Sequence, residues 1–193
     1  MVIMFIGLIV SGCAKAATPV PTVTLLPILS PAPTPKPAGV TLTYEGNAQV
    51  ELVTPTGRHV YLDVTDPSQL VKQPTADDIL LTTHGHSDHY YKAWADAFPG
   101  QQILFSTGKI NLPDVTITSI ASGHNAGDPL LDKGGTNYIY VIDLGGLRIA
   151  HFGDIGQDAL TAGQLAALGS VDIAIMQFDN SFSMMNATNM KGF

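Results

Sequence analysis

The chain contains a single cysteine, Cys13, among its 193 residues, so it cannot form a disulfide bond within itself. Charged residues are also scarce, at 13% of the chain, whereas hydrophobic residues make up 45%. This balance is typical of a folded domain and excludes a chain that is disordered over most of its length.

Positive charge is scarcer than negative charge. Nine Lys and Arg residues stand against sixteen Asp and Glu residues, and the net charge is −7. From residue 40 onward, seven basic residues face the same sixteen acidic ones, which gives −9. Because contacts to phosphates need Lys and Arg, nucleic acid is not expected as a partner. Bound divalent cations would offset part of the negative charge.

The N-terminus is apolar and lacks the basic residues that usually open a signal peptide. Residues 1–12 are too short for a spanning helix, which needs about 20 residues, but they fit the apolar part of a signal peptide. The sequence VSGC at residues 10–13 resembles a bacterial lipobox, in which the cysteine becomes lipidated. We therefore expect residues 1–13 to be a lipoprotein signal peptide. An ordinary secretory signal and a buried N-terminal helix are the alternatives.

Lipid chains on Cys13 would hold the protein at a membrane surface without a spanning helix. The expected location is the bacterial cell envelope, on the extracytoplasmic side, with secretion as the alternative. Residues 14–39 are expected to be a linker, because seven of the thirteen prolines fall between residues 18 and 38. Proline lacks a backbone donor and favours polyproline II, so this linker would be semi-rigid.

The remaining residues, 40–193, are expected to form one domain that is rich in strands. Alternation of apolar and polar residues, or short apolar runs bounded by turns, predicts each strand. The predicted strands cover residues 40–45, 48–53, 59–64, 79–81, 103–105, 115–120, 137–143, 147–152 and 171–175. Helical spacing is found at residues 90–98 and 158–168, and Asp66 is expected to cap a short helical turn at residues 67–71.

Residues 84–89 give the clearest indication of a metal-binding site in the sequence. After the apolar strand at residues 79–81, His84, His86, Asp88 and His89 fall within six residues. Imidazole is the commonest metal ligand in proteins, and a carboxylate beside it suits a hard divalent ion. His84 and His86 share a face of an extended chain, and Asp88 and His89 follow at the turn. The spacing can offer one pair of ligands to each of two ions. The alternatives are a solvated His-rich loop, or Asp88 as a helix cap.

The His-x-His-x-Asp-His pattern resembles the signature of the metallo-β-lactamase fold superfamily. The resemblance implies an α/β (α+β) fold, an αββα sandwich. It also implies that His84 and His86 bind one zinc ion and that Asp88 and His89 bind a second. It places a third ligand of the first zinc at His124, just after a strand.

The same resemblance implies a carboxylate that bridges the two ions. Asp154 fits this position, because it follows a hairpin, a strand and Gly153. The alternative is that Asp154 caps the next helix. His151 belongs to a His-x-Gly-Asp run that is common in lactonase-like members of the superfamily, and we expect it in the core or behind the ligands.

The function implied is hydrolysis by a zinc-activated water or hydroxide. One or two Zn²⁺ ions are expected, with Mn²⁺ or Fe as alternatives, and the substrate would be a small ester, lactone, amide or phosphodiester. Asp88 is the expected catalytic residue, since its carboxylate can orient the hydroxide and pass a proton to the leaving group.

One expected ligand is missing. The superfamily places a further histidine on a later strand, but no histidine follows Asp154. We expect a domain that is incomplete at its C-terminus, with its second half truncated; the alternative is a complete domain with an altered second metal site. Three other functions stay open: a non-catalytic metal-binding lipoprotein, a truncated inactive member, and a diiron redox protein, which would need more carboxylate ligands.

Four other polar residues are given no metal role. His59 lies alone on a strand and is expected to be structural or exposed. Asp77 and Asp78 precede the central strand and are expected to form a solvated entry to it. Asn47 stands near the position where lactonase-like relatives often carry a histidine, and no role is assigned to it.

Overall fold

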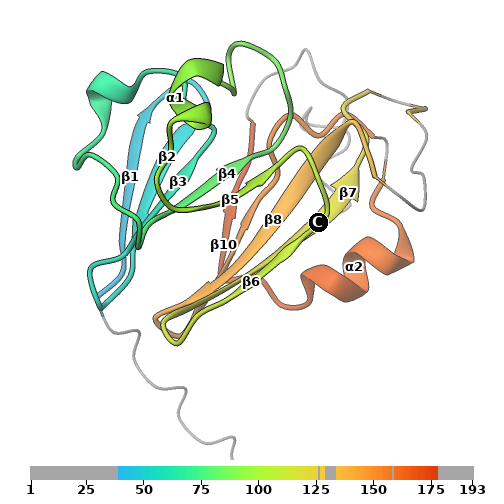
Figure 1. Cartoon of the computed structure of the whole chain (residues 1–193). Helices are drawn as coiled ribbons and strands as arrows, with labels where there is room; N and C mark the ends of the chain where they lie inside the picture. Colours follow the sequence, from blue (N-terminus) through green and yellow to red (C-terminus); the bar gives the residue numbers. More distant parts are fainter. Residues whose placement is uncertain (1–38, 126, 129–133, 158, 178–193) are drawn as a thin grey trace, which may run out of the picture. The chain divides into compact units, whose positions relative to one another are not determined.

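The computed structural model describes residues 39–125, 127–128, 134–157 and 159–177, which belong to a single compact unit. The expected signal peptide with Cys13, and the expected linker except for its last residue, lie outside the described residues. The description below therefore concerns the expected domain (Figure 1).

Five strands form the first sheet in the order in which they occur in the chain. They are β1 (Thr41–Gly46), β2 (Gln49–Val53), β3 (His59–Leu62), β4 (Ile79–Thr82) and β5 (Gln101–Leu104). The first three strands are antiparallel, as their tight turns require, and β4 and β5 run parallel to β3. The predicted hairpin turn at Gly46 and Asn47 is confirmed, and both residues have positive φ angles.

Five strands also form the second sheet, in the spatial order β10-β9-β8-β7-β6. They are β6 (Lys109–Asn111), β7 (Val115–Ser122), β8 (Asn137–Leu144), β9 (Leu147–His151) and β10 (Ile173–Ile175). All neighbours are antiparallel except β9 and β10. The short strand β6 was not predicted, because three residues carry too little alternation to be recognised.

The helices are shorter than predicted. The first, α1, spans Lys92–Asp96, and the second, α2, spans Ala162–Leu168. The start of α2 is set by Thr161, which forms a capping box with Gln164. The short 3-10 helix η1 (Pro67–Gln69) is capped by Asp66, as predicted. Within the described part of the chain, neither helix has the length and apolarity needed to cross a bilayer.

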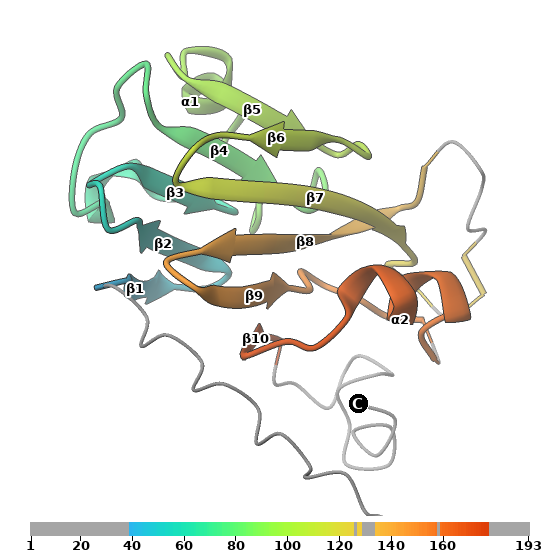
Figure 2. The ribbon, with the colours of Figure 1, turned by 90° about the horizontal axis from the view of Figure 1, so that it is seen from below.

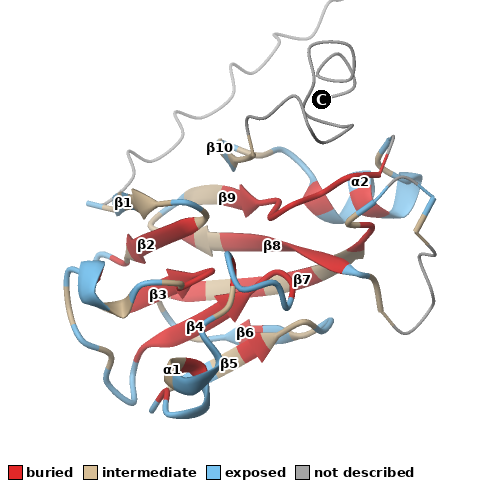
Figure 3. Cartoon of the chain, turned by 90° about the horizontal axis from the view of Figure 1, so that it is seen from above, coloured by how far each residue is buried: buried red, intermediate tan, exposed pale blue. Residues whose placement is uncertain are grey.

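Three apolar clusters show how these elements are layered. The largest lies between the sheets and includes Leu62, Leu81 and Ile142. A second packs Phe98 and the α1 region against the outer face of the first sheet, and a third packs Leu168 of α2 against the outer face of the second sheet. Burial follows these layers, and Figure 3 colours most of β3, β4 and β8 as buried. Figure 2 shows the strands of the two sheets from below, with α2 near β9. The αββα sandwich expected from the sequence is confirmed.

The topology brings the ends of several strands to one edge of the sandwich. The strands β3, β4 and β5 are parallel, so they end together in the first sheet. In the second sheet β7 and β9 are both antiparallel to β8, and β10 is parallel to β9, so these three strands also end together. Polar contacts between the residues that follow these strands join the two sets of ends. We call this the site edge.

The expected solvated entry before β4 is only half correct. Asp77 is exposed, but Asp78 is buried, and its carboxylate accepts hydrogen bonds from the backbone N–H groups of His59 (2.9 Å) and Thr75 (2.7 Å). These bonds replace water around the carboxylate and keep its pKa below the usual value, although burial alone would raise it. His59 is structural, as expected: it is buried, and its ring bonds to the buried Glu51.

We predict that Tyr140→Phe lowers the free energy of unfolding by about 1–3 kcal/mol. The fully buried hydroxyl of Tyr140 reaches from β8 to the carbonyls of Thr82 (2.7 Å) and Ile103 (2.8 Å) in the opposite sheet. Phenylalanine would leave these carbonyls without that donor. Urea unfolding measures the difference. Tyr91→Phe is the matched control, because Tyr91 is 48% exposed, and it should change stability by less than about 0.5 kcal/mol.

Candidate metal centre

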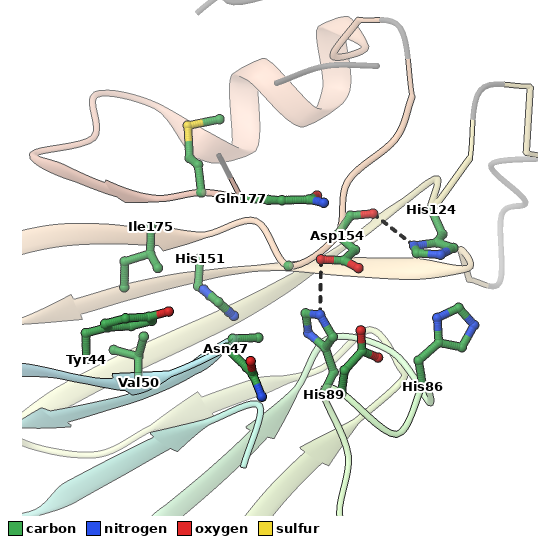
Figure 4. Close-up of a pocket in the computed structure, with 14 residues that line it drawn as sticks. Tyr44, Asn47, Val50, His86, His89, His124, His151, Asp154, Ile175 and Gln177 are labelled. Atoms are coloured by element: carbon green, nitrogen blue, oxygen red, sulfur yellow. Dashed lines mark hydrogen bonds and ion pairs between the residues drawn. The ribbon is translucent and has the colours of Figure 1, made fainter. Parts of the chain in front are cut away.

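The six residues selected from the sequence meet at the site edge. The loop after β4 carries His84, His86, Asp88 and His89, whereas His124 follows β7 and Asp154 follows β9. Figure 4 shows His86, His89, His124 and Asp154 turned toward one another, although they come from opposite sheets. Their role as ligands remains a prediction; their proximity is a feature of the structure.

His84 is buried at the centre of the cluster. Its Nδ1 lies 3.2 Å from Oγ1 of Thr83, which itself donates to Asp63 at 2.8 Å and therefore accepts from the imidazole. The hydrogen of His84 is thereby assigned to Nδ1, and the lone pair to Nε2. Burial and the positive charge of His89 lower the pKa of His84 to about 4, so the ring is neutral. Its Nε2 is buried and has no hydrogen-bond partner among the described residues.

His86 and Asp88 are exposed at the mouth of the site. The ring of His86 lies 4.7 Å from that of His84 and 4.7 Å from that of His124, measured between centroids. Asp88 does not cap α1, because the N-cap position belongs to Tyr91, which makes no side-chain cap hydrogen bond. Asp88 lines the same pocket as His86.

His89 lies between two carboxylates. Its Nδ1 is 2.9 Å from Asp63, and its Nε2 is 3.0 Å from Asp154. Burial alone would lower the pKa of His89, but the hydrogen bonds to Asp154 and Asp63 outweigh it and raise the pKa to about 10. Without a metal ion this ring is therefore an imidazolium, and an ion that takes Nε2 as a ligand must displace its proton.

His124 is fixed by the loop that carries Asp154. Its Nδ1 lies 3.0 Å from the Asp154 carbonyl, which can only accept, so this nitrogen carries the hydrogen. In a neutral ring the lone pair is then on Nε2. Two further hydrogen bonds hold this loop: Gly156 N–H donates to the Gly123 carbonyl at 3.0 Å, and the backbone N–H of His124 donates to Thr136 Oγ1 at 2.8 Å.

Asp154 faces the histidines and does not cap a helix, since Thr161 caps α2. Besides its contact with His89, its carboxylate lies 3.9 Å from His84 Nε2. Burial opposes ionisation of Asp154, but the hydrogen bond from His89 and the charge of that ring dominate and lower its pKa. The carboxylate is therefore ionised at neutral pH.

The donor atoms fall into two overlapping groups. His84, His86 and His124 form one, and His84, Asp88 and His89 form the other; within each group the donor atoms lie within 4.8 Å of one another. The unpartnered Nε2 of His84 is an available lone pair in the middle of both groups. Nitrogen and oxygen donors without a thiolate suit Zn²⁺, Mn²⁺ and Fe²⁺. The residues present fit a divalent metal ion.

Asp63 is a site residue that sequence reasoning missed. It follows β3, is fully buried and has a φ angle of 49°. Its carboxylate accepts from Thr83 N–H (2.7 Å), Thr83 Oγ1 (2.8 Å), His89 and His151 Nε2 (2.7 Å). Burial raises its pKa, but the bonds from His151 and His89 overcome this and hold the pKa well below its usual range. A carboxylate behind a ligating histidine fixes its tautomer and orientation.

A cavity of about 730 Å³ opens beside the cluster. One side is polar and includes His86, Asp88, His89, His124 and Asp154. The other side is largely apolar and is lined by Tyr44, Ala48, Val50, Ile175 and Met176. The amide side chains of Asn47 and Gln177 also line the cavity (Figure 4). This volume suits a small molecule. Asn47, given no role from the sequence, is therefore a wall residue of the pocket.

We predict that Gly153→Ala lowers the free energy of unfolding by about 2–5 kcal/mol. Gly153 has a φ angle of 55°, and an added Cβ would lie 2.6 Å from Thr83 Cβ and 2.6 Å from Asn137 Oδ1. Asp154 would move with the displaced backbone, so metal retention should also fall. Calorimetry and metal analysis of the purified variant measure both effects.

The matched control is Gly146→Ala. Gly146 also has a positive φ angle, 82°, but no atom lies within 4 Å of its added Cβ. It isolates the backbone strain, which costs about 1–2 kcal/mol. Equal losses in the two variants would contradict the steric role assigned to Gly153.

Comparison with known proteins identifies the family of this chain. The model of the β-lactamase superfamily domain matches residues 41–192. The UPF0173 metal-dependent hydrolase of Rubrobacter xylanophilus is 29% identical over 156 residues, which cover 77% of this chain and 60% of the relative. The chain thus spans about 60% of the length of this curated relative.

Solved structures agree on the fold. A protein of Parabacteroides distasonis, provisionally assigned as a metal-dependent hydrolase, gives a TM-score of 0.51 at 18% identity, over 75% of this chain and 72% of that one. A variant of CmlA, a diiron β-hydroxylase of Streptomyces venezuelae, gives 0.52 at 15% identity, over 82% of this chain and 39% of that one. With the family model spanning nearly the whole described domain, the chain belongs to the metallo-β-lactamase superfamily.

Proposed function

We propose that the chain is a metal-dependent hydrolase that acts on a small ester, lactone, amide or phosphodiester. The observation that carries the proposal is the buried Nε2 of His84, which lacks a hydrogen-bond partner in the described part of the chain although donor atoms from both sheets surround it. The similarity to the metal-dependent hydrolase of Rubrobacter xylanophilus supports the same activity.

Each residue has a role in this proposal. A bound divalent ion would act as a Lewis acid and lower the pKa of a water molecule from about 15.7 to about 7. His84, His86 and His124 would hold one ion, and Asp88 and His89 a second, with Asp154 between them. Zn²⁺ is our first choice, with Mn²⁺ and Fe as alternatives. Asp63 keeps His89 in position by accepting from its Nδ1.

Asp88 is the proposed catalytic residue. It is exposed, lines the cavity and neighbours the histidines, so its carboxylate can orient the attacking water and carry a proton to the leaving group. The mixed polar and apolar lining suits substrates of lactone or ester type, in which a polar reacting group is attached to an apolar remainder. The His-x-Gly-Asp run at residues 151–154 supports a place in the lactonase-like branch.

The test compares the metal-free chain with chains reloaded with Zn²⁺, Mn²⁺ or Fe²⁺. Bound metal is counted by mass spectrometry, and turnover is measured on a panel of lactones, aryl esters, an amide and a phosphodiester. We expect one or two ions per chain and turnover that chelation removes and reloading restores. Stoichiometric metal without turnover of any panel member would instead favour the non-catalytic metal-binding function.

We also propose that the protein is lipidated on Cys13 and held at the extracytoplasmic face of a bacterial membrane. Support comes from the lipobox-like sequence at residues 10–13 and the proline-rich segment that follows it. Expression of the whole chain in bacteria, with detergent phase partitioning, tests this location. Cys13→Ala should move the protein from the detergent phase to the aqueous phase. Partitioning of both proteins into the aqueous phase would exclude the lipid anchor.

A further inference from the structure

His151 has a buried polar atom that the proposed chemistry does not use. The residue ends β9 and is 4% exposed. Its Nε2 lies 2.7 Å from Asp63, whereas its Nδ1 is buried and has no hydrogen-bond partner in the part of the chain that the structure describes. The same residue lines the cavity beside the cluster.

The hydrogen-bond partner of His151 Nε2 determines whether Nδ1 is a donor or an acceptor. The Asp63 oxygen that faces His151 already accepts from Thr83 Oγ1 at 2.8 Å, so Nε2 of His151 donates to it and carries the hydrogen. In a neutral ring Nδ1 then holds a lone pair and acts as an acceptor. A buried acceptor without a partner costs free energy, whereas a ligand that donates to it removes the cost.

The surroundings of Nδ1 narrow the choice of ligand. The neighbouring lining is largely apolar: it includes Val50, Ile175 and the ring of Tyr44, whose hydroxyl is its polar atom, and Figure 4 draws His151 between these residues and His89. Gln177, after β10, adds a side-chain carbonyl that is also buried without a partner among the described residues. A cationic donor would lose its hydration against the apolar wall, and an anion would meet an acceptor. A neutral N–H or O–H group fits best.

We propose that His151 Nδ1 is a substrate-binding acceptor. It receives a hydrogen bond from a neutral amide N–H or hydroxyl on the apolar arm of the substrate, while the bond to be hydrolysed lies at the His and Asp cluster. This subsite rests on the proposed function, since it identifies the class of substrate that the hydrolase would prefer. His151 thus serves both Asp63, through Nε2, and the ligand, through Nδ1.

The first experiment uses two ligands that differ only in the donor. N-hexylacetamide carries an amide N–H, and N-hexyl-N-methylacetamide does not; both keep the carbonyl and the chain. Each is titrated into the full-length, zinc-loaded protein with ¹⁵N-labelled histidines, and NMR follows the ring nitrogens and the integrity of the ligand. We expect the secondary amide to bind about three- to tenfold more tightly and to shift the Nδ1 resonance of His151 alone.

Two substitutions assign the preference to one atom. His151→Gln keeps an N–H group near Nε2 for Asp63 but leaves no acceptor at the position of Nδ1, so the affinity ratio of the two amides should fall to about one. His151→Asn retains an oxygen near Nδ1 and loses the bond to Asp63, so the ratio should persist. The ratio is taken within each variant, and therefore a change in metal loading or stability cancels.

Equal affinity for the two amides in the unsubstituted protein would overturn the proposal, because the amide N–H would then contribute no hydrogen bond to Nδ1. A preference that survives His151→Gln would overturn it as well, and Gln177→Leu would then show whether Gln177 is the acceptor. These measurements need no hydrolysis. Absence of turnover on the ester and lactone panel would therefore reject the proposed function without deciding the amide result. Equal affinity for the two amides would reject the subsite without deciding whether the chain is a hydrolase.

Discussion

His86→Ala is expected to lose bound zinc and hydrolytic turnover together, while its free energy of unfolding in a chelator stays within about 0.5 kcal/mol of the unsubstituted chain. His86 is exposed, so its side chain contributes little to the core. It nevertheless supplies one of the three imidazoles in the first donor group. Zinc affinity should fall more than about 100-fold, since even residues behind a ligand contribute 10–100-fold.

The measurement has three parts: zinc retained after dialysis, turnover of the best panel substrate, and urea unfolding in EDTA. Ser87→Ala is the matched control, because Ser87 is the exposed neighbour of His86 in the same loop and is given no role in the site. It should retain zinc and turnover. Normal zinc and turnover in His86→Ala would mean that the first donor group is not the metal site.

Asp63→Asn is expected to lower the free energy of unfolding by about 3–5 kcal/mol, the usual cost of removing one partner of a buried ion pair. The Asp63 carboxylate has no exposed surface and accepts from Thr83, His89 and His151. An asparagine has one accepting oxygen and places an NH₂ group where one of these donors points. His89 would lose its fixed orientation, so zinc affinity should also fall about 10–100-fold.

Chemical denaturation in EDTA measures the stability term, and competition with a zinc chelator measures the affinity. Asp96→Asn is the matched control: this exposed carboxylate pairs with Lys92 one helical turn away, and such pairs contribute little. A loss below about 1 kcal/mol in Asp63→Asn would show that the buried network does not support the fold.

The same carboxylate gives a pH dependence. Its pKa is held well below the usual value by His151 and His89 despite burial, so the folded state binds this proton less readily than the unfolded chain does. The stabilisation is complete above the unfolded pKa of about 3.9 and is lost as pH falls below it. Asp63→Asn should remove this part of the acid sensitivity.

Much of the fold could be predicted from the sequence because most strands carry their own pattern. The apolar run before His84 and the alternation around residues 137–143 fix buried strands wherever they are placed. The boundaries of α1 and the start of α2 depended on tertiary contacts and on the capping box at Thr161. The prediction was wrong by two residues at each end of α1 and by four at the start of α2, whereas the end of α2 was correct. Strand β6 exists only because it pairs with β7.

The candidate site divides in the same way. His84, His86, Asp88 and His89 are close in sequence, so their proximity needed no topology. Predicting Asp63 as a site residue would have required the topology, since only the parallel pairing of β3 with β4 brings the end of β3 beside the histidine loop. In the sequence Asp63 is one polar position in a predicted strand, and no residue pattern indicates its positive φ angle. An acid at the end of a strand was the signal available.

The residues predicted to be ligands come from both layers of the sandwich: His84, His86, Asp88 and His89 follow β4 in the first sheet, whereas His124 and Asp154 follow β7 and β9 in the second. An ion bound among them would cross-link two sheets that otherwise contact each other mainly through apolar side chains. The unfolded chain does not form this cross-link, so the free energy of metal coordination adds to the free energy of folding. Resistance to heat and proteolysis would then follow the supply of metal around the protein.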